Sequence, residues 1–476
     1  MKYRRKNSSS SHAISKLIVL SNIFVLGFIL LILNHYNSEN VLSLKNIDPS
    51  ILTSLKNNKP ITVFASFNGS YPKNSCEKVW NFGNIHICLM KIYSRNELNY
   101  LINHYKVLSI LSYKSPKPIK RYFLTAKTQN IFKYDFRKED IDNKFDNFHW
   151  MWCGKGVTVA IIDTGIDYLN PDFYDVNGKT IIKALVSCLY TINGSCLVNN
   201  TTGYNMTQMW GVYEYDHQFE VNYGQFAYED RNGHGTHVAG IIAGRGWVSH
   251  RKYIGIAPCS KLVIIKAFNK NGSAGLSQVL NALEWCYKYC KDYNVTVLSL
   301  SWGIEMPSIG NDPVSLAVSQ IAKEGITVFV AAGNNLNIPG TITTPAVDPD
   351  VLTVGAWDPY YNKLAWFSSM GPTRNGEIKP DFVAPGVYIV SVKSQFAVFP
   401  NNLVINYTNG SYVALSGTSM ATPDAAGCFV DFEQWYYNRY HKLPNKTDFI
   451  NFEKVNGIRY DNKKDFIEGY AIIQCP

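Results

Sequence analysis

The sequence predicts an α/β fold, in which helices cover both faces of a mostly parallel sheet, preceded by a small α+β unit. After Gly156, short apolar or β-branched runs of strand length alternate with segments of helical spacing. The runs are apolar at nearly every position, which is typical of strands buried on both faces. Strands that alternate with helices indicate parallel connections and a sheet enclosed in helical layers.

The predicted strands occupy residues 157–163, 261–268, 295–303, 326–334 and 351–357, and the predicted helices between them occupy 233–244, 276–290 and 312–325. In open sheets of this class, ligands bind at the carboxyl ends of the strands. Polar residues that end these runs are therefore the first candidates for a functional site.

Upstream, residues 61–122 form a separate α+β unit, with predicted strands at 61–67 and 85–93 and a helix running into another strand over 95–111. We expect a linker over 36–60, a polar linker or processing region over 123–149, and the main domain over 150–476. The charge-mixed stretch "KYDFRKEDIDNKFDN" lies in the second of these linkers.

The N-terminus carries a candidate membrane anchor. From Leu17 to Leu33, only Ser21 and Asn22 are polar, and basic residues precede this run. Such a pattern predicts a cytosolic basic tail over 1–16, a transmembrane signal-anchor over 17–35, and a single-pass protein with its main domain on the extracytoplasmic side. A cleaved signal peptide, giving a secreted protein, is the alternative, although no small-residue cleavage site follows.

Charge does not indicate a nucleic-acid partner. The formal net charge is +10, and five of those charges lie before Leu17. The other five are spread over the rest of the chain, where no basic stripe with interleaved aromatic residues occurs. We therefore expect no nucleic-acid binding.

Ten cysteines suit an extracytoplasmic chain. Cys76 with Cys88, and Cys188 with Cys196, are plausible local disulfides. Cys286 and Cys290 lie one helical turn apart, where a mutual bridge is poorly oriented, so other partners or free thiols are expected. The chain permits N-glycosylation, because sequons occur at Asn68, Asn193, Asn199, Asn200, Asn205, Asn271, Asn294, Asn406, Asn409 and Asn445.

Four polar residues stand at strand or helix ends: Asp163, His234, Asn334 and Ser419. Taken singly, each has a structural explanation, because Asp and Ser are common helix caps and Asn is a common turn residue. Together they supply what acyl transfer requires. A serine nucleophile needs a base, the base needs an orienting carboxylate, and the oxyanion needs a donor.

These residues lie in the motifs "VAIIDTGID", "HGTHVAGIIAG", "AAGN" and "SGTSMATP", with "SSMGPTRNGEIKPDFVAPG" before the last of them. Over residues 154–470 the sequence resembles the subtilisin family of serine proteases, which has the same order of residues. The resemblance implies the three-layer subtilisin fold and a serine endopeptidase that needs no cofactor for chemistry. In that family's mechanism, Asp163 would orient the imidazole of His234, and His234 would be the base. Ser419 would be the nucleophile and Asn334 an oxyanion donor. A second histidine, His237, would have a packing role.

The resemblance also implies polypeptide substrates bound in extended form. The matching segments are Ser301, Trp302 and Gly303, and Gly272, Ser273, Ala274 and Gly275. The unit at 61–122 would be an inhibitory propeptide, cut between about Lys117 and Asp140. The alternative is a catalytically inactive relative that acts as a binding or assembly protein.

The sequence departs from the family pattern at three places. Asp424 replaces the histidine of "TSMATPH", which predicts a shifted activity–pH profile. The segment "GRGWVSHRKYIGIAP" contains no carboxylate where many relatives bind calcium, so no calcium ion is expected there, whereas structural calcium sites elsewhere in the chain stay open. The long insertion over 186–230 is either a surface loop or a satellite core.

Overall fold

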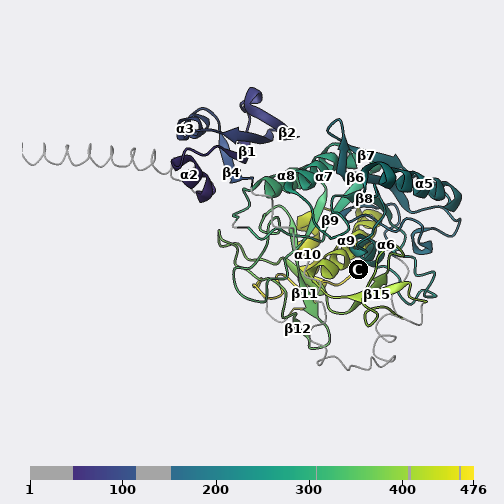
Figure 1. The fold of residues 1–476 in the computed structure, drawn as a ribbon. Helices are drawn as coiled ribbons and strands as arrows, with labels where there is room; N and C mark the ends of the chain where they lie inside the picture. The colour runs from purple at the N-terminus through teal and green to yellow at the C-terminus, as the bar shows by residue number, and fades with distance from the viewer. Residues whose placement is uncertain (1–46, 114–151, 307, 406–408, 460–462) are drawn as a thin grey trace, which may run out of the picture.

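The computed structural model describes residues 47–113, 152–306, 308–405, 409–459 and 463–476 (Figure 1). No helix within these ranges is long and apolar enough to cross a membrane. The predicted anchor at 17–35 and the predicted processing region at 123–149 lie outside the described residues.

The main domain is built on a nine-stranded sheet with the order β12-β11-β10-β9-β5-β8-β6-β7, and β13 pairs with β11. The central strands run parallel to one another, from β11 through β10, β9, β5 and β8 to β6. The edge strands β7 and β12 pair antiparallel with β6 and β11. The strands span Thr158–Asp163 (β5), Ile182–Ile192 (β6), Ser195–Asn200 (β7), Lys261–Lys266 (β8), Val295–Leu300 (β9), Thr327–Ala331 (β10), Leu352–Asp358 (β11), Lys363–Leu364 (β12) and Phe382–Pro385 (β13).

Strand β5 shows why its sequence is apolar throughout. Val159 and Ile161 belong to a core on one face of the sheet, whereas Ala160 and Ile162 belong to the core on the other face. Helices α6 (His234–Ala243) and α9 (Thr418–Tyr440) contribute to the first core, and α7 (Leu276–Tyr289) and α8 (Pro313–Lys323) to the second (Figure 1). The predicted α/β fold with a helix-covered sheet is therefore confirmed.

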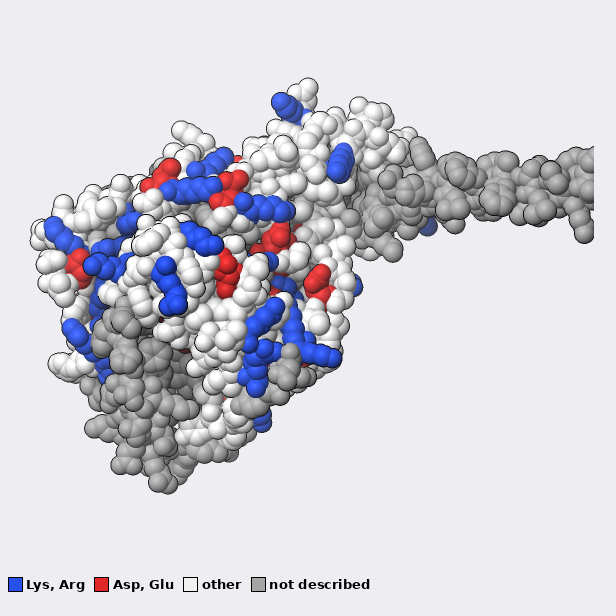
Figure 2. Space-filling view, turned by 180° about the vertical axis from the view of Figure 1, so that it is seen from behind, with Lys and Arg blue, Asp and Glu red and all other residues white. Residues whose placement is uncertain are grey.

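Further elements complete the main domain. Helix α10 (Lys446–Asn456) packs with α9, and a hairpin of β14 (Ile389–Val392) and β15 (Tyr412–Leu415) contacts α6. Three short 3-10 helices span Pro171–Phe173, Cys290–Tyr293 and, in the small domain, Lys73–Ser75. On the face seen in Figure 2, Lys and Arg side chains are widespread, and acidic side chains lie among them at several places.

The upstream unit is an antiparallel sheet with the order β2-β3-β1-β4 and two helices. Its elements are α2 (Pro49–Lys56), β1 (Ile61–Asn68), β2 (Cys76–Phe82), β3 (Ile85–Ile92), α3 (Arg95–His104) and β4 (Val107–Ser112). The predicted linker at 36–60 is wrong in its second half, because α2 buries Ile51 and Leu55 in the core of this small domain. Asp48 caps α2, and its carboxylate accepts from Ser50 N at 2.8 Å.

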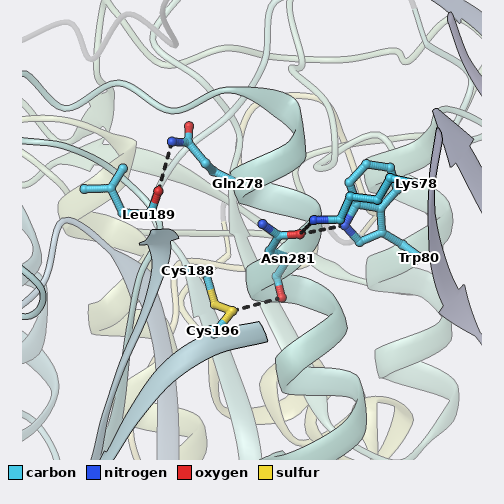
Figure 3. Close-up of a disulfide and its surroundings, with 7 residues drawn as sticks. All are labelled: Lys78, Trp80, Cys188, Leu189, Cys196, Gln278 and Asn281. Atoms are coloured by element: carbon cyan, nitrogen blue, oxygen red, sulfur yellow. Dashed lines mark hydrogen bonds between the residues drawn. A yellow bond between two sulfur atoms is a disulfide. The ribbon is translucent and has the colours of Figure 1, made fainter. Parts of the chain in front are cut away.

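The small domain contacts α7 through polar groups. Lys78 Nζ and Trp80 Nε1 both donate to Asn281 Oδ1, at 2.7 and 2.8 Å (Figure 3). The backbone N–H of Asn81 donates to Glu284 Oε1 at 2.9 Å. Trp80 is buried, so loss of the Asn281 acceptor would leave an unpaired indole N–H in the interface.

Four disulfides cross-link the described chain. The predicted local pairs Cys76–Cys88 and Cys188–Cys196 are both present. Two pairs that were not predicted, Cys153–Cys259 and Cys428–Cys475, join segments that are distant in sequence. Cys286 and Cys290 are buried and form no disulfide, although the Cys290 thiol lies 2.7 Å from Cys286 Sγ, closer than their spacing suggested.

The insertion at 186–230 has its own secondary structure and packs onto the main core, so it is neither a surface loop nor a separate satellite core. It contains the end of β6, the strand β7 and the helix α5 (Met206–Tyr223), which has Asn205 as its N-cap. Met209, Val212 and Phe219 of α5 join the main core. The Cys188–Cys196 hairpin lies on the first turns of α7, where Gln278 Nε2 donates to Leu189 O at 3.2 Å (Figure 3).

Two buried acids in α9 and α10 predict that stability falls as pH rises. Burial raises the pKa of Asp431 and of Glu453 to about 8. Asp431 Oδ1 and Glu453 Oε1 are buried with no hydrogen-bond partner in the part of the chain that the structure describes. Both groups ionise near pH 4 when unfolded, so their stabilising effect is complete below pH 4 and is lost as pH rises through 8.

We therefore expect the free energy of unfolding to fall by about 2–4 kcal/mol for each of the two groups between pH 5 and pH 8. Urea unfolding across this range measures it, with Ser419→Ala as the background to prevent self-digestion. Asp431→Asn and Glu453→Gln should each flatten the dependence, whereas Asp292→Asn, at an exposed site, should leave it unchanged. Equal slopes in all variants would contradict the assignment.

Candidate active site

The carboxylate of Asp163 lies at the carboxyl end of β5, where the sequence places it. Its side chain is fully buried. Asp163 Oδ1 accepts from Thr164 N at 2.6 Å and from Thr164 Oγ1 at 3.1 Å. His234 Nδ1 lies 3.0 Å from both carboxylate oxygens. The structure thus brings Asp163 and His234 together, with the imidazole held through Nδ1.

His234 is the first residue of α6, and its placement depends on close backbone packing. A Cβ atom on Gly235 would lie 2.2 Å from Gly165 O, so only glycine lets α6 approach the turn after Asp163. The Gly235 N–H donates to Thr164 Oγ1 at 2.9 Å. The "DTG" and "HG" dipeptides of the two motifs are therefore in direct contact.

Asp230, which the sequence reasoning missed, fixes the start of α6. Its carboxylate accepts from Gly233 N at 2.7 Å and from Thr236 N and Thr236 Oγ1 at 2.8 Å. A carboxylate on the first-turn N–H groups stabilises a helix start. The sequence did offer a sign of this role, because an Asp shortly before a predicted helix is a candidate acceptor for the first N–H groups, and Asp230 stands four residues before His234.

Ser419 lies in the first turn of α9. Its Oγ donates to Ser301 O, which follows β9, at 2.8 Å. Next to it, Thr418 donates twice to Asn334 Oδ1, through its N–H and its Oγ1, both at 3.0 Å. The structure thus brings Ser419 together with Ser301, and Asn334 together with the segment that carries Ser419.

The two bonds from Thr418 orient the Asn334 amide. Because Oδ1 is held by Thr418, the Nδ2 group points away from it. A Cβ atom built on Gly417 would lie 3.4 Å from Asn334 Nδ2. The amide donors therefore lie beside the backbone that leads into Ser419. A side-chain amide in that position can serve as an oxyanion donor.

The predicted substrate-binding segments lie after β9 and before α7. Trp302 is buried, and its Nε1 donates to Ile162 O at 2.9 Å. Gly303 faces Thr343, because a Cβ there would lie 2.2 Å from Thr343 Oγ1. In the other segment, Ala274 is buried, Asn269 N donates to Ser273 O at 2.9 Å, and Gly272 N donates to Asn269 O at 2.8 Å. Gly275 is the N-cap of α7.

His237 has the packing role expected of it. It is fully buried, and burial, with the nearby His234, lowers its pKa to about 3. Its Nε2 lies 3.1 Å from Ile389 O and 3.0 Å from Val413 O. The neutral imidazole thus ties α6 to the β14–β15 hairpin.

Asp424, the departure from the family motif, lies in α9 and is half-buried. Burial raises its pKa to about 7. Its expected influence on the activity–pH profile stays a prediction. Asp424→His tests it, and an unmoved activity–pH curve would contradict it.

Asp172 holds the segment that follows α6 through both its side-chain carboxylate and its backbone carbonyl. Asp172 Oδ1 accepts from Val248 N at 3.2 Å, Asp172 Oδ2 accepts from Tyr412 Oη, and Arg245 N donates to Asp172 O at 2.9 Å. N–H and O–H donors aimed at one carboxylate occupy the acceptor atoms that a hard cation would need. Among the described residues, no group of three His, Cys, Asp or Glu side chains is arranged to hold a metal ion.

We therefore expect that a calcium chelator leaves the melting temperature of the domain unchanged. Tyr412→Phe should instead lower the stability by about 1–3 kcal/mol, because the buried Asp172 carboxylate loses a donor. Thermal unfolding with and without chelator measures both, and Tyr440→Phe, at an exposed position of α9, is the matched control. A large chelator-dependent drop would contradict the expectation.

Comparison with known proteins places the chain in a family. The Subtilase family model, Peptidase_S8, matches residues 154–444, which is more than half of the chain. The chain is 36% identical over 286 residues to the serine protease AprX of Bacillus subtilis, covering 58% of this chain and 56% of that protein. It is 31% identical over 278 residues to a subtilisin of Bacillus pumilus, covering 58% of this chain and 76% of that protein.

Solved structures agree in fold. Sphericase has a TM-score of 0.51 at 21% identity, covering 70% of this chain and 96% of that one. The CspB protease of Clostridium perfringens has a TM-score of 0.54 at 18% identity, covering 70% and 95%. The chain spans 56% of AprX and 59% of a thermophilic serine proteinase of Bacillus sp. (strain AK1), so it matches little more than half of these relatives. The family match and the shared fold together show that this chain belongs to the subtilase family.

Proposed function

We propose that the protein is a serine endopeptidase, with Ser419 as nucleophile, His234 as general base and acid, and Asp163 as the orienting carboxylate. The observation that carries the proposal is the contact of His234 Nδ1 with both oxygens of the buried Asp163, at 3.0 Å. A carboxylate on Nδ1 selects the tautomer with a free Nε2, which is the form that accepts a proton from serine.

In the proposed reaction, Ser419 Oγ attacks the scissile carbonyl carbon as its proton passes to His234 Nε2. The C=O oxygen becomes an oxyanion, which Asn334 Nδ2 and the Ser419 N–H would stabilise. His234 then protonates the leaving amine, and an acyl-enzyme forms. Water, deprotonated by His234, hydrolyses the acyl-enzyme and restores Ser419.

Substrates would bind as extended polypeptide against the backbone of residues 301–303 and 272–275. Support comes from the contact of Ser419 Oγ with Ser301 O at 2.8 Å, because it joins the proposed nucleophile to one of these two segments. The burial of Trp302 and Ala274 supports a fixed rather than a mobile backbone in these segments.

The chain would be made as a membrane-tethered zymogen, with the small domain as its inhibitory propeptide. The support is the contact of the small domain with α7 through Lys78, Trp80 and Asn281. The tether is proposed from the sequence of residues 17–35 alone. N-terminal sequencing of protein purified from the producing cell would show whether the chain is cut after the anchor, and whether it is cut after the small domain.

Cleavage profiling of the purified chain on a peptide library tests the proposed function. The expected result is cleavage at internal peptide bonds, inhibited by serine-reactive reagents and insensitive to chelators. A folded, processed sample that cuts no peptide in the library would contradict the proposal and favour a binding role.

A further inference from the structure

Helix α5 of the insertion carries a buried carboxylate that binds the backbone of another segment. Asp216 is fully buried, and Asp216 Oδ1 accepts from the N–H groups of Ala227 and Tyr228, the second at 3.1 Å. Asp216 Oδ2 accepts from Glu229 N at 2.7 Å and from Tyr168 Oη at 3.2 Å. Three consecutive backbone N–H groups thus converge on one side chain.

This segment leads directly into the proposed catalytic base. Residue 229 is followed by Asp230, whose carboxylate fixes the start of α6, and α6 begins at His234. Four residues therefore separate Glu229 from His234 along the chain. If the segment at 227–229 moved, the Asp230 carboxylate and the His234 imidazole would move with it, because the turn between them is short and hydrogen-bonded.

The same segment also lies against the turn that follows Asp163. Ile166 N donates to Tyr228 O at 3.4 Å, and a Cβ on Gly165 would lie 2.3 Å from that oxygen. From the sheet, the buried Lys266 donates through Nζ to Glu229 O. Lys266 is the β8 partner of Asp163 in the parallel register. The segment is thus held between helix α5 and the strand ends that carry Asp163.

We propose that Asp216 is a positioning residue for the peptidase reaction, which acts through the backbone of residues 227–229 to hold His234 in line with Asp163. The inference rests on the proposed function. It gives the insertion at 186–230 a role in catalysis, because Asp216 and the backbone that it holds both belong to the insertion, which ends just before the base.

The chemistry of the contact requires a carboxylate. An ionised carboxylate has acceptor positions for all three N–H groups and for the Tyr168 hydroxyl. In Asp216→Asn, one oxygen is replaced by an NH₂ group, which would point its own hydrogens at an N–H donor. At least one buried N–H group then loses its acceptor, and the segment has to move to find another.

The experiment compares the full-length wild type with Asp216→Asn, after counting active sites with a fluorophosphonate. We expect kcat per labelled site to fall about 10- to 100-fold, because a small displacement of a catalytic group has effects of this size. KM should change by less than about threefold, because Asp216 does not line the substrate segments. The acid limb of the kcat/KM–pH profile should also move, because it reports the pKa of the base in the free enzyme.

Glu214→Gln is the matched control, because it removes a carboxylate from an exposed position of the same helix. It should leave kcat, KM and the pH profile unchanged. A purely structural role for Asp216 would lower the number of labelled sites while kcat per site stays at the wild-type value, and that result would overturn the proposal.

If Asp216→Asn does not fold, the test passes to Tyr168→Phe, which removes only the hydroxyl that donates to Asp216 Oδ2. A fall in kcat per labelled site of about two- to tenfold, with KM unchanged, is expected there. An unchanged kcat would overturn the positioning role. A folded wild type that neither cleaves peptides nor takes up label would instead overturn the proposed function, and the positioning role with it.

Discussion

Replacement of Ser419 by alanine is expected to abolish peptide cleavage by the purified chain, with a loss in kcat of roughly 10⁶-fold, the size seen when the serine of subtilisin itself is removed. The reason is that alanine has no hydroxyl to attack the scissile carbonyl, whereas Ser419 Oγ is the proposed nucleophile. Rates with a peptide substrate from the library measure the loss.

The same variant tests the zymogen. If the chain cuts itself, Ser419→Ala should retain the small domain as one uncut polypeptide, visible by mass and by N-terminal sequence. Ser195→Ala, at an exposed position of β7, is the control and should be processed and active as the wild type. Normal processing of Ser419→Ala in a protease-free preparation would contradict self-cleavage.

Asp163→Asn is expected to lower kcat about 10⁴-fold at neutral pH without unfolding the domain. The variant is nearly isosteric. It replaces one of the two oxygens that lie 3.0 Å from His234 Nδ1 by an NH₂ group. The imidazole then loses the acceptor that selects its tautomer and stabilises its protonated form.

Kinetics of Asp163→Asn should be measured with an active-site count and with a melting curve, so that misfolding is separated from loss of orientation. Asp292→Asn, at an exposed position, is the control and should have wild-type kinetics. A kcat within tenfold of wild type would show that Asp163 does not orient the base.

Local patterns explain why so much of the site was predictable. The strand that ends at Asp163 and the helix that begins at His234 each lie in one continuous motif, where residue types change abruptly from apolar to polar. The parallel sheet then brings these ends together, because its strands share one direction. Motif order and strand ends were therefore sufficient to propose Asp163, His234, Asn334 and Ser419.

Long-range contacts were not predictable in the same way. Cys153–Cys259 spans 106 residues and Cys428–Cys475 spans 47, and no local spacing marks either pair. Asp216 resembles any polar residue of an aromatic-rich helix until α5 is packed against residues 227–229. Its partners are backbone N–H groups, which leave no mark in a sequence.

Two elements of the small domain, β2 and α2, were not predicted from the sequence. Strand β2 was missed because its apolar residues are interrupted by Glu77, Lys78 and Asn81, and one of these, Lys78, is used to contact α7. Helix α2 was assigned to a linker because it is only eight residues long, although Asp48 and Pro49 are typical of a helix start. Short elements at the edge of a small core depend on tertiary contacts.

Covalent labelling with a fluorophosphonate, followed by peptide mapping, tests the central claim most directly. We expect about one label per folded, processed chain, located on Ser419, absent in Ser419→Ala and formed much more slowly in Asp163→Asn. A folded chain that takes up no label, or that carries it on another residue, would contradict the assignment of Asp163, His234 and Ser419 as a catalytic triad.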